Sequence, residues 1–165
     1  MNTKELLDRI FERLKEEICL KDFKLKRSDS EFIRRKNSGF DQIGFEHYVT
    51  VKSHSEPDLG LNLRLYFANR YDILHNWFEK YSMLSIEILR YESSFSYTPK
   101  NLGLDDKNFF SFDGDDFDTA YDSFLNEIIT GADYFFNRVN SLKKCYENYI
   151  VPAIESGSSV LPDEG

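Results

Sequence analysis

The stretch that decides the fold is FDQIGFEHYVTVKSHSEPDLGLNLRLYFAN, residues 40–69. Apolar and polar side chains alternate with period two over 40–53 and again over 59–69, as in half-buried strands. The first strand is expected to turn one set of side chains toward the core: Ile43, Phe45, His47, Val49 and Val51. The second does so with Leu59, Leu61, Leu63, Leu65 and Phe67. Pro57 marks the turn between them, so two antiparallel strands are predicted.

The residues before these strands predict a helix and two shorter strands. Residues 3–19 carry apolar side chains at spacings of three and four, which gives an amphipathic helix one apolar stripe. Residues 23–28 and 31–36 predict a hairpin with one solvent-exposed, basic face. This part of the chain is basic, because residues 1–36 hold 11 Lys and Arg against 8 Asp and Glu.

Beyond residue 69 the pattern changes twice. Residues 71–81 take a helical period, and Trp77 is expected to lie in the core. Residues 84–97 predict a strand that ends before Pro99, since proline disfavours continued pairing. Residues 109–112 predict a last short strand.

The C-terminal part predicts helix over residues 116–150, as one long helix or as two that break near Gly131, with Pro152 as the stop. The whole order indicates an α+β fold: an N-terminal helix, an antiparallel β-meander of about five to six strands with one inserted helix, and the C-terminal helix or helix pair packed on one sheet face. Residues 1–154 are expected to form a single domain, and residues 155–165 a disordered tail.

Acidic and aromatic residues are concentrated in residues 104–122, which contain seven Asp and one Lys and carry most of the chain's formal net charge of −8. A purely solvating acidic segment has few aromatic residues. Charge steers a basic partner and rings supply contact area, so this segment is the predicted partner-binding surface. Its expected contact residues are Phe109, Phe110, Phe112, Asp113, Asp115, Asp116, Phe117, Asp118, Tyr121 and Asp122.

Composition narrows the class of partner. A pI near 4.9 argues against general binding to nucleic acid or to an anionic membrane. The N-terminus lacks the basic and apolar regions of a signal peptide, and no apolar run approaches the length of a membrane span, so a cytoplasmic protein is expected. Cys19 and Cys145 match no metal or redox spacing and are expected to be free thiols among apolar neighbours in helices.

The segment also offers a catalytic alternative. Carboxylates at 113, 115, 116 and 118 are the ligand type that divalent cations prefer, and a metal-assisted hydrolase is the enzymatic alternative. The run is no EF-hand loop, because Phe124 stands where a bidentate Glu is needed. His47 and His75 form no short metal-binding pair, and no nucleophile or phosphate-loop motif occurs. We therefore expect no enzyme and no cofactor.

A basic cluster offers a nucleic-acid alternative. It comprises Lys21, Lys24, Lys26, Arg27, Arg34, Arg35 and Lys36. Phe23 and Phe32 interleave it, as in surfaces that bind single strands. The competing interpretation is the solvent face of a hairpin, whose cations also protect a sheet edge from aggregation. The acidity of the whole chain favours the second interpretation.

By length, acidity, the helix–meander–helix order and the acidic, aromatic segment 105–122, the chain resembles the small acidic α+β immunity proteins that bacteria encode beside toxins. The resemblance implies a non-catalytic protein that binds a cognate, basic toxin and blocks its active site or assembly. Two other functions stay open: an acidic mimic of nucleic acid, and a module that self-associates through a sheet face left open by the helices.

Overall fold

The computed structural model describes residues 3–51, 59–81, 93–103, 109–112 and 116–156. Its helices are α1 (Thr3–Glu16), α2 (Asp72–Tyr81), α4 (Phe117–Arg138), α5 (Leu142–Cys145) and α6 (Val151–Ser156). Its strands are β1 (Lys24–Lys26), β2 (Glu31–Lys36), β3 (Gly39–Val51), β4 (Leu59–Tyr71), β5 (Phe95–Tyr97) and β6 (Phe110–Phe112). Short 3-10 turns lie at Ile18–Leu20 and Arg27–Asp29, and a π-helical turn at Tyr146–Ile150 joins α5 to α6.

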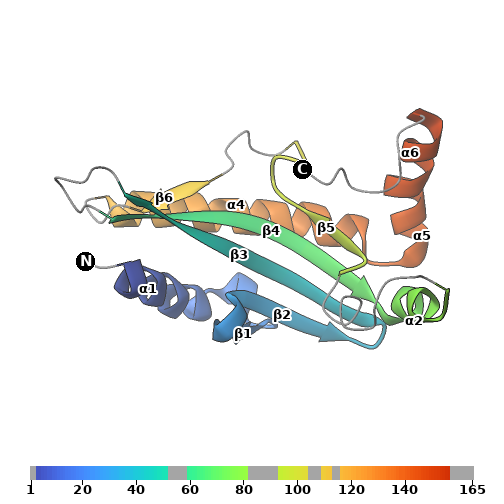
Figure 1. Cartoon of the computed structure of the whole chain (residues 1–165), viewed down its shortest axis with the longest axis horizontal. Coiled ribbons are helices and arrows are strands. Elements are labelled where there is room, and N and C mark those ends of the chain that lie inside the picture. The colour runs from blue at the N-terminus through green and yellow to red at the C-terminus, as the bar shows by residue number, and fades with distance from the viewer. Residues whose placement is uncertain (1–2, 52–58, 82–92, 104–108, 113–115, 157–165) are drawn as a thin grey trace.

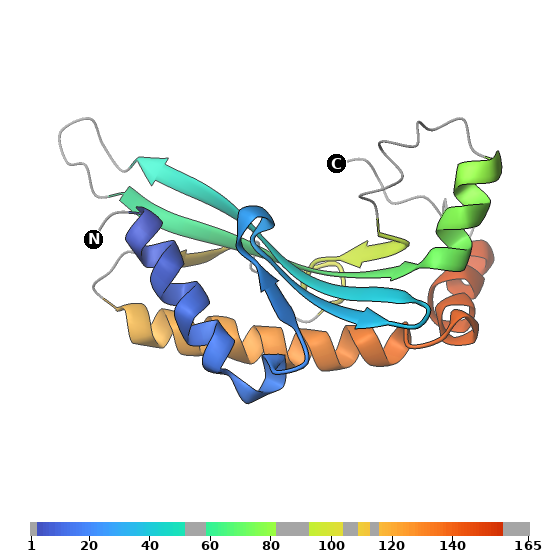
Figure 2. The ribbon, with the colours of Figure 1, turned by 90° about the horizontal axis from the view of Figure 1, so that it is seen from below.

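The strands form one antiparallel sheet in the order β1-β2-β3-β4-β5, and β6 pairs beside β5 on the same edge of β4. The two long strands β3 and β4 pair from Gly39 opposite Tyr71 to Val51 opposite Leu59. Helices α1 and α4 both lie on one side of the sheet, and α4 runs along most of its length (Figure 1, Figure 2). The predicted α+β class, with a meander, an inserted helix and a C-terminal helix packed on the sheet, is confirmed.

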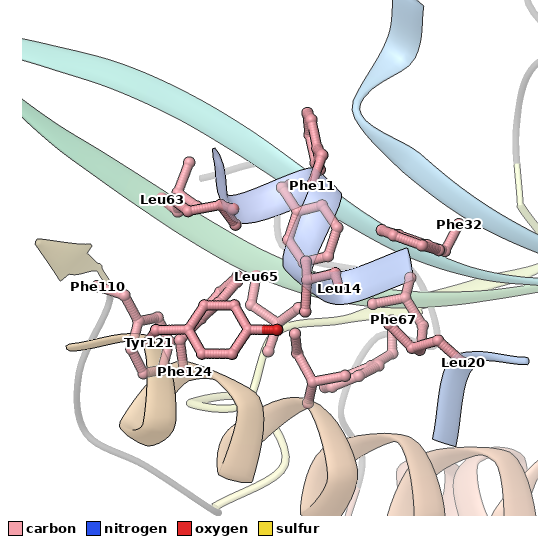
Figure 3. Packing of buried hydrophobic residues seen from close by; sticks show 14 of the residues in the cluster. Phe11, Leu14, Leu20, Phe32, Leu63, Leu65, Phe67, Phe110, Tyr121 and Phe124 are labelled. Atoms are coloured by element: carbon pink, nitrogen blue, oxygen red, sulfur yellow. The ribbon is translucent and has the colours of Figure 1, made fainter. Parts of the chain in front are cut away.

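The core lies between this face of the sheet and the two helices. Alternation turns Leu61, Leu63, Leu65 and Phe67 of β4 inward, and each is at most 1% exposed. They meet the apolar stripe of α1, which comprises Leu6, Ile10, Phe11 and Leu14. Figure 3 shows Phe11 and Leu14 of α1 near Leu65 of β4, with Tyr121 and Phe124 of α4 on the other side of Leu65.

The C-terminal helices differ from prediction at their breaks. α4 continues through Gly131, which is buried because its Cα lies close to the Phe67 ring; an added Cβ would be 2.3 Å from a ring carbon. The helix ends instead at Arg138, where the Tyr71 hydroxyl donates to the Val139 carbonyl and Ser141 caps α5. Of the two alternatives that the sequence left open, a break near Gly131 is therefore wrong, and α4 ends after Arg138 instead.

Pro152 does not stop the helical region but is the second residue of α6. A wider π-helical turn precedes it, which relaxes the backbone where proline cannot donate a hydrogen bond. Residues 155 and 156, expected in a disordered tail, belong to α6; residues 157–165 lie outside the described part of the chain. Most of the predicted strand 84–97 also lies outside it, and β5 ends at Tyr97, before Pro99 as expected.

Candidate protein-binding surface

The aromatic residues of the acidic segment mostly face the core. In β6, Phe110 and Phe112 point inward and pair with Leu63 and Leu61 of β4, while Ser111 points outward. Phe117 and Tyr121, one helical turn apart at the start of α4, are also buried. The expectation that these four rings lie at a surface is wrong, because β6 and α4 use them to close one end of the core.

Phe124, one turn beyond Tyr121, is the centre of this packing. Its ring lies 5.4 Å from Phe45, 5.1 Å from Phe110 and 5.7 Å from Phe112, centroid to centroid. The pairs with Phe110 and Phe112 are edge to face, and such pairs stabilise a core beyond the area that they bury. The short strand β6 therefore pairs with β4 through its backbone and packs on α4 through its two rings.

Two carboxylates of the same segment, Asp118 and Asp122, face outward but are paired within the fold. Asp118 accepts a hydrogen bond from Arg13 at 2.5 Å and lies 3.7 Å from Arg9, and Asp122 lies 3.9 Å from Arg13. The side chains of Asp118 and Asp122 remain 75% exposed. The basic N-terminal part and the acidic segment thus attract each other directly, α1 against α4.

The two arginines also contact the rings beneath the carboxylates. The Arg9 guanidinium lies 3.7 Å from the Phe117 centroid, and that of Arg13 lies 3.8 Å from the Tyr121 centroid. Stacking of this kind is worth about 0.5–1 kcal/mol at an exposed site. The Tyr121 hydroxyl donates to Glu17 at 3.0 Å, and burial together with this carboxylate raises the Tyr121 pKa.

Two members of the predicted site remain available at the surface. Asp116 is exposed at the N-cap position of α4, where negative charge favours the positive end of the helix dipole. Phe109, just before β6, is 43% exposed. Asp113 and Asp115 lie outside the described residues, so their placement stays a prediction.

The structure adds Tyr48 of β3 to this surface. Its ring is 46% exposed and meets Phe109 edge to face at 5.3 Å. Its hydroxyl donates to Glu46 at 2.8 Å. β6, the start of α4 and the last part of β3 lie at the same end of the molecule (Figure 1). We call six residues of these segments the acidic–aromatic end: Glu46, Tyr48, Phe109, Asp116, Asp118 and Asp122.

Several other predicted placements are wrong. His47 is exposed, because β3 continues beyond Gly44, where its pairing with β2 ends. Trp77 is 56% exposed, since α2 turns Leu74 and His75 toward the core instead. Cys19 is exposed, although partial desolvation of its thiol and the nearby Glu17 carboxylate raise its pKa. Cys145 is buried as expected, and burial raises the pKa of its thiol.

The basic cluster divides between the two faces of its hairpin. Lys24, Lys26, Arg27 and Arg35 are exposed. Arg34 and Lys36 point to the other face, where both bind the buried Asp41 at 2.8 and 2.5 Å. Asn69 also donates to Asp41, at 2.7 Å. This network was not predicted from the sequence. Asp41 lies on the same inward-facing side of β3 as Ile43 and Phe45, and it pairs with Arg34 of β2 in the sheet.

A shallow pocket lies between α4 and the residues that follow α1. Its volume is about 360 Å³, and its lining includes Cys19, Phe23, Arg34, Asp133, Phe136 and Asn137. Arg34 is held there over Phe23, with its guanidinium carbon 4.7 Å from the ring centroid. The pocket combines a cation, a carboxylate and apolar rings.

The described residues contain no group of three or more His, Cys, Asp or Glu side chains arranged to hold a metal ion. Within the same part of the chain, no helix has both the length and the apolar character to cross a membrane. Comparison of the sequence with protein-family models and curated proteins, and of the fold with solved structures, finds no match.

Proposed function

We propose that this protein is a non-catalytic inhibitor of the immunity type, which binds and neutralises a basic protein through the acidic–aromatic end. The observation that carries the proposal is the exposed Tyr48–Phe109 pair at the same end of the molecule as the exposed carboxylates of α4. Aromatic side chains surrounded by charge are typical anchors of protein interfaces, because rings supply buried area and charge supplies steering.

The burial of four of the predicted rings changes how such an interface would work. Contact area would come from Tyr48 and Phe109 instead of from Phe110, Phe112, Phe117 and Tyr121. Long-range attraction would come from the net charge of −8 and from carboxylates not already bound to arginine. Asp118 and Asp122 each face Arg13, whose positive charge offsets part of the negative electrostatic potential of these two carboxylates.

The first experiment is capture of a partner. The tagged protein is purified from its own host at low salt, and co-eluting proteins are identified by mass spectrometry. The proposal predicts one stoichiometric basic protein that is released as salt rises, because attraction between exposed charges is screened. The absence of any such protein would contradict it.

A pair of matched charge variants then tests the surface. The variant Asp113→Asn, Asp115→Asn, Asp116→Asn removes three carboxylates from the predicted site. The control Asp133→Asn, Glu147→Gln, Glu155→Gln removes three from α4 beyond its midpoint and from the C-terminal helices, away from that end (Figure 1). We expect the first variant to release the partner at lower salt and the control to behave as wild type. Equal behaviour of the two variants would show that net charge alone attracts the partner.

A further inference from the structure

Strand β3 has an open edge along its last residues. β2 pairs with β3 as far as Glu31 opposite Gly44, and the Phe45 N–H donates to the Ser30 carbonyl at 3.0 Å. β3 continues to Val51 with β4 paired on its other side. In the part of the chain that the structure describes, no strand pairs with the outer edge of residues 46–51, and Figure 2 shows no helix alongside that edge.

The Phe45 hydrogen bond defines which backbone groups face this edge. In a strand, the N–H and C=O of one residue point to the same side, and successive residues alternate. Because Phe45 points toward β2, the backbone groups of His47 and Val49 point to the open edge, and those of Tyr48 point to β4. The edge therefore presents a row of donors and acceptors that fits another extended chain.

The side chains along this edge do not block such pairing. Sheet edges are usually protected by lysine, proline or a bulge. Residues 46–51 read EHYVTV and pair with β4 in unbroken register. Val49, 50% exposed, lies on the core-facing side next to buried Leu61, while Glu46 and Tyr48 lie on the opposite face.

We infer that the edge of β3 at residues 46–51 receives an extended segment of the basic partner as an added strand, an inference that rests on the proposed function. The alternation of β3 specifies this segment. Its side chains next to Val49 are apolar. Those next to Tyr48 and Glu46, whose carboxylate also lies 3.5 Å from Arg64 of β4, are cationic. A second copy of this chain fits less well, because both copies carry a charge of −8.

The test uses a short synthetic peptide of alternating lysine and valine with blocked ends, titrated into the full chain and followed by amide NMR. We expect peptide to slow hydrogen exchange at the His47 and Val49 amides, whereas Tyr48 is already bonded to β4. Unchanged hydrogen exchange at both the His47 and the Val49 amides of the wild-type protein would overturn the inference.

Two substitutions at one position separate the backbone from the side chain. Val49→Pro removes an outward N–H and is compatible with an edge strand, whereas Val49→Thr keeps the N–H and the branched shape. We expect the peptide Kd to rise about tenfold for Val49→Pro relative to Val49→Thr, the equivalent of one lost hydrogen bond with its neighbours. Equal affinity of the two variants would contradict strand addition.

The same variants separate this inference from the proposed function. If the captured partner binds Val49→Pro and Val49→Thr equally, the edge is not its docking site, although the inhibitor proposal stands. Sedimentation of the wild-type chain alone tests whether the edge binds a second copy of this chain instead. A dimer that Val49→Pro converts to monomer would assign the edge to a second copy and overturn the partner strand.

Discussion

Helices α2 and α4 both carry two aromatic residues one turn apart, and the two pairs have opposite environments. Phe117 and Tyr121 of α4 stack at 6.1 Å between centroids and are buried. Trp77 and Tyr81 of α2 lie 5.4 Å apart and are both more than half exposed. α4 extends along the sheet, whereas α2 lies at one end of it (Figure 1). Spacing along a helix defines which residues share a face, and the neighbouring elements decide whether that face is covered.

The largest expected effect is a loss of stability when a buried ring of α4 is truncated, which no side chain of the exposed face of α2 should match. Phe124→Ala should lower the free energy of unfolding by about 3–5 kcal/mol, because it leaves a cavity among Phe45, Phe110 and Phe112. Chemical denaturation followed by circular dichroism measures it. If the variant does not fold, Phe124→Leu gives a smaller loss in the same direction. A loss below about 1 kcal/mol for Phe124→Ala would contradict the described packing.

Gly131→Ala tests how closely α4 approaches the Phe67 ring. Alanine favours a helix by about 1 kcal/mol over glycine, yet its Cβ would overlap the Phe67 ring, so a net loss of about 1–2 kcal/mol is expected. Gly60→Ala in β4 is the control, because the space around its Cβ is open. Thermal unfolding of both variants measures the difference. Stabilisation by Gly131→Ala would mean that α4 does not approach Phe67 this closely.

Trp77→Ala is the counterpart on α2. Since this side chain is more exposed than buried, truncation should lower the free energy of unfolding by no more than about 1 kcal/mol. Chemical denaturation under the same conditions as for Phe124→Ala gives the comparison. A loss as large as that of Phe124→Ala would place Trp77 in the core after all.

Asp118→Asn should have the smallest effect on stability. Exposed ion pairs typically contribute about 0.2–1 kcal/mol, and the contacts of Arg9 and Arg13 with the rings of Phe117 and Tyr121 remain. The expected loss is about 0.5 kcal/mol or less, and it should fall further in high salt. Unfolding in low and high salt measures both. A loss of several kcal/mol that persists in high salt would show that the pair is not screened by solvent.

The strands and the first helix were predictable because their patterns are local. The alternation over 40–53 and 59–69 locates β3 and β4, and the stripe of residues 3–19 locates α1. The α+β class follows from the order of these elements. The periodicity also indicated correctly which residues of β4 turn inward.

The candidate site was less predictable because it depends on contacts between distant segments. The sequence shows Asp118 and Asp122 as free charge, but Arg9 and Arg13 reach them only through the packing of α1 beside α4. It likewise shows Phe110 and Phe112 as available rings, but pairing of β6 with β4 buries them. Tyr48 gains its significance only from Phe109, which is far away in the sequence.

The central claim is that the acidic segment 104–122 uses its charge on a partner while most of its rings serve the core. The most direct measurement is the association rate with the captured partner, by stopped flow over a range of salt concentrations. The Asp113→Asn, Asp115→Asn, Asp116→Asn variant should associate more slowly at low salt and depend less on salt, with a loss of stability of no more than about 1 kcal/mol from the Asp116 charge at the N-cap of α4. A rate and salt dependence equal to those of the wild-type protein would contradict the claim.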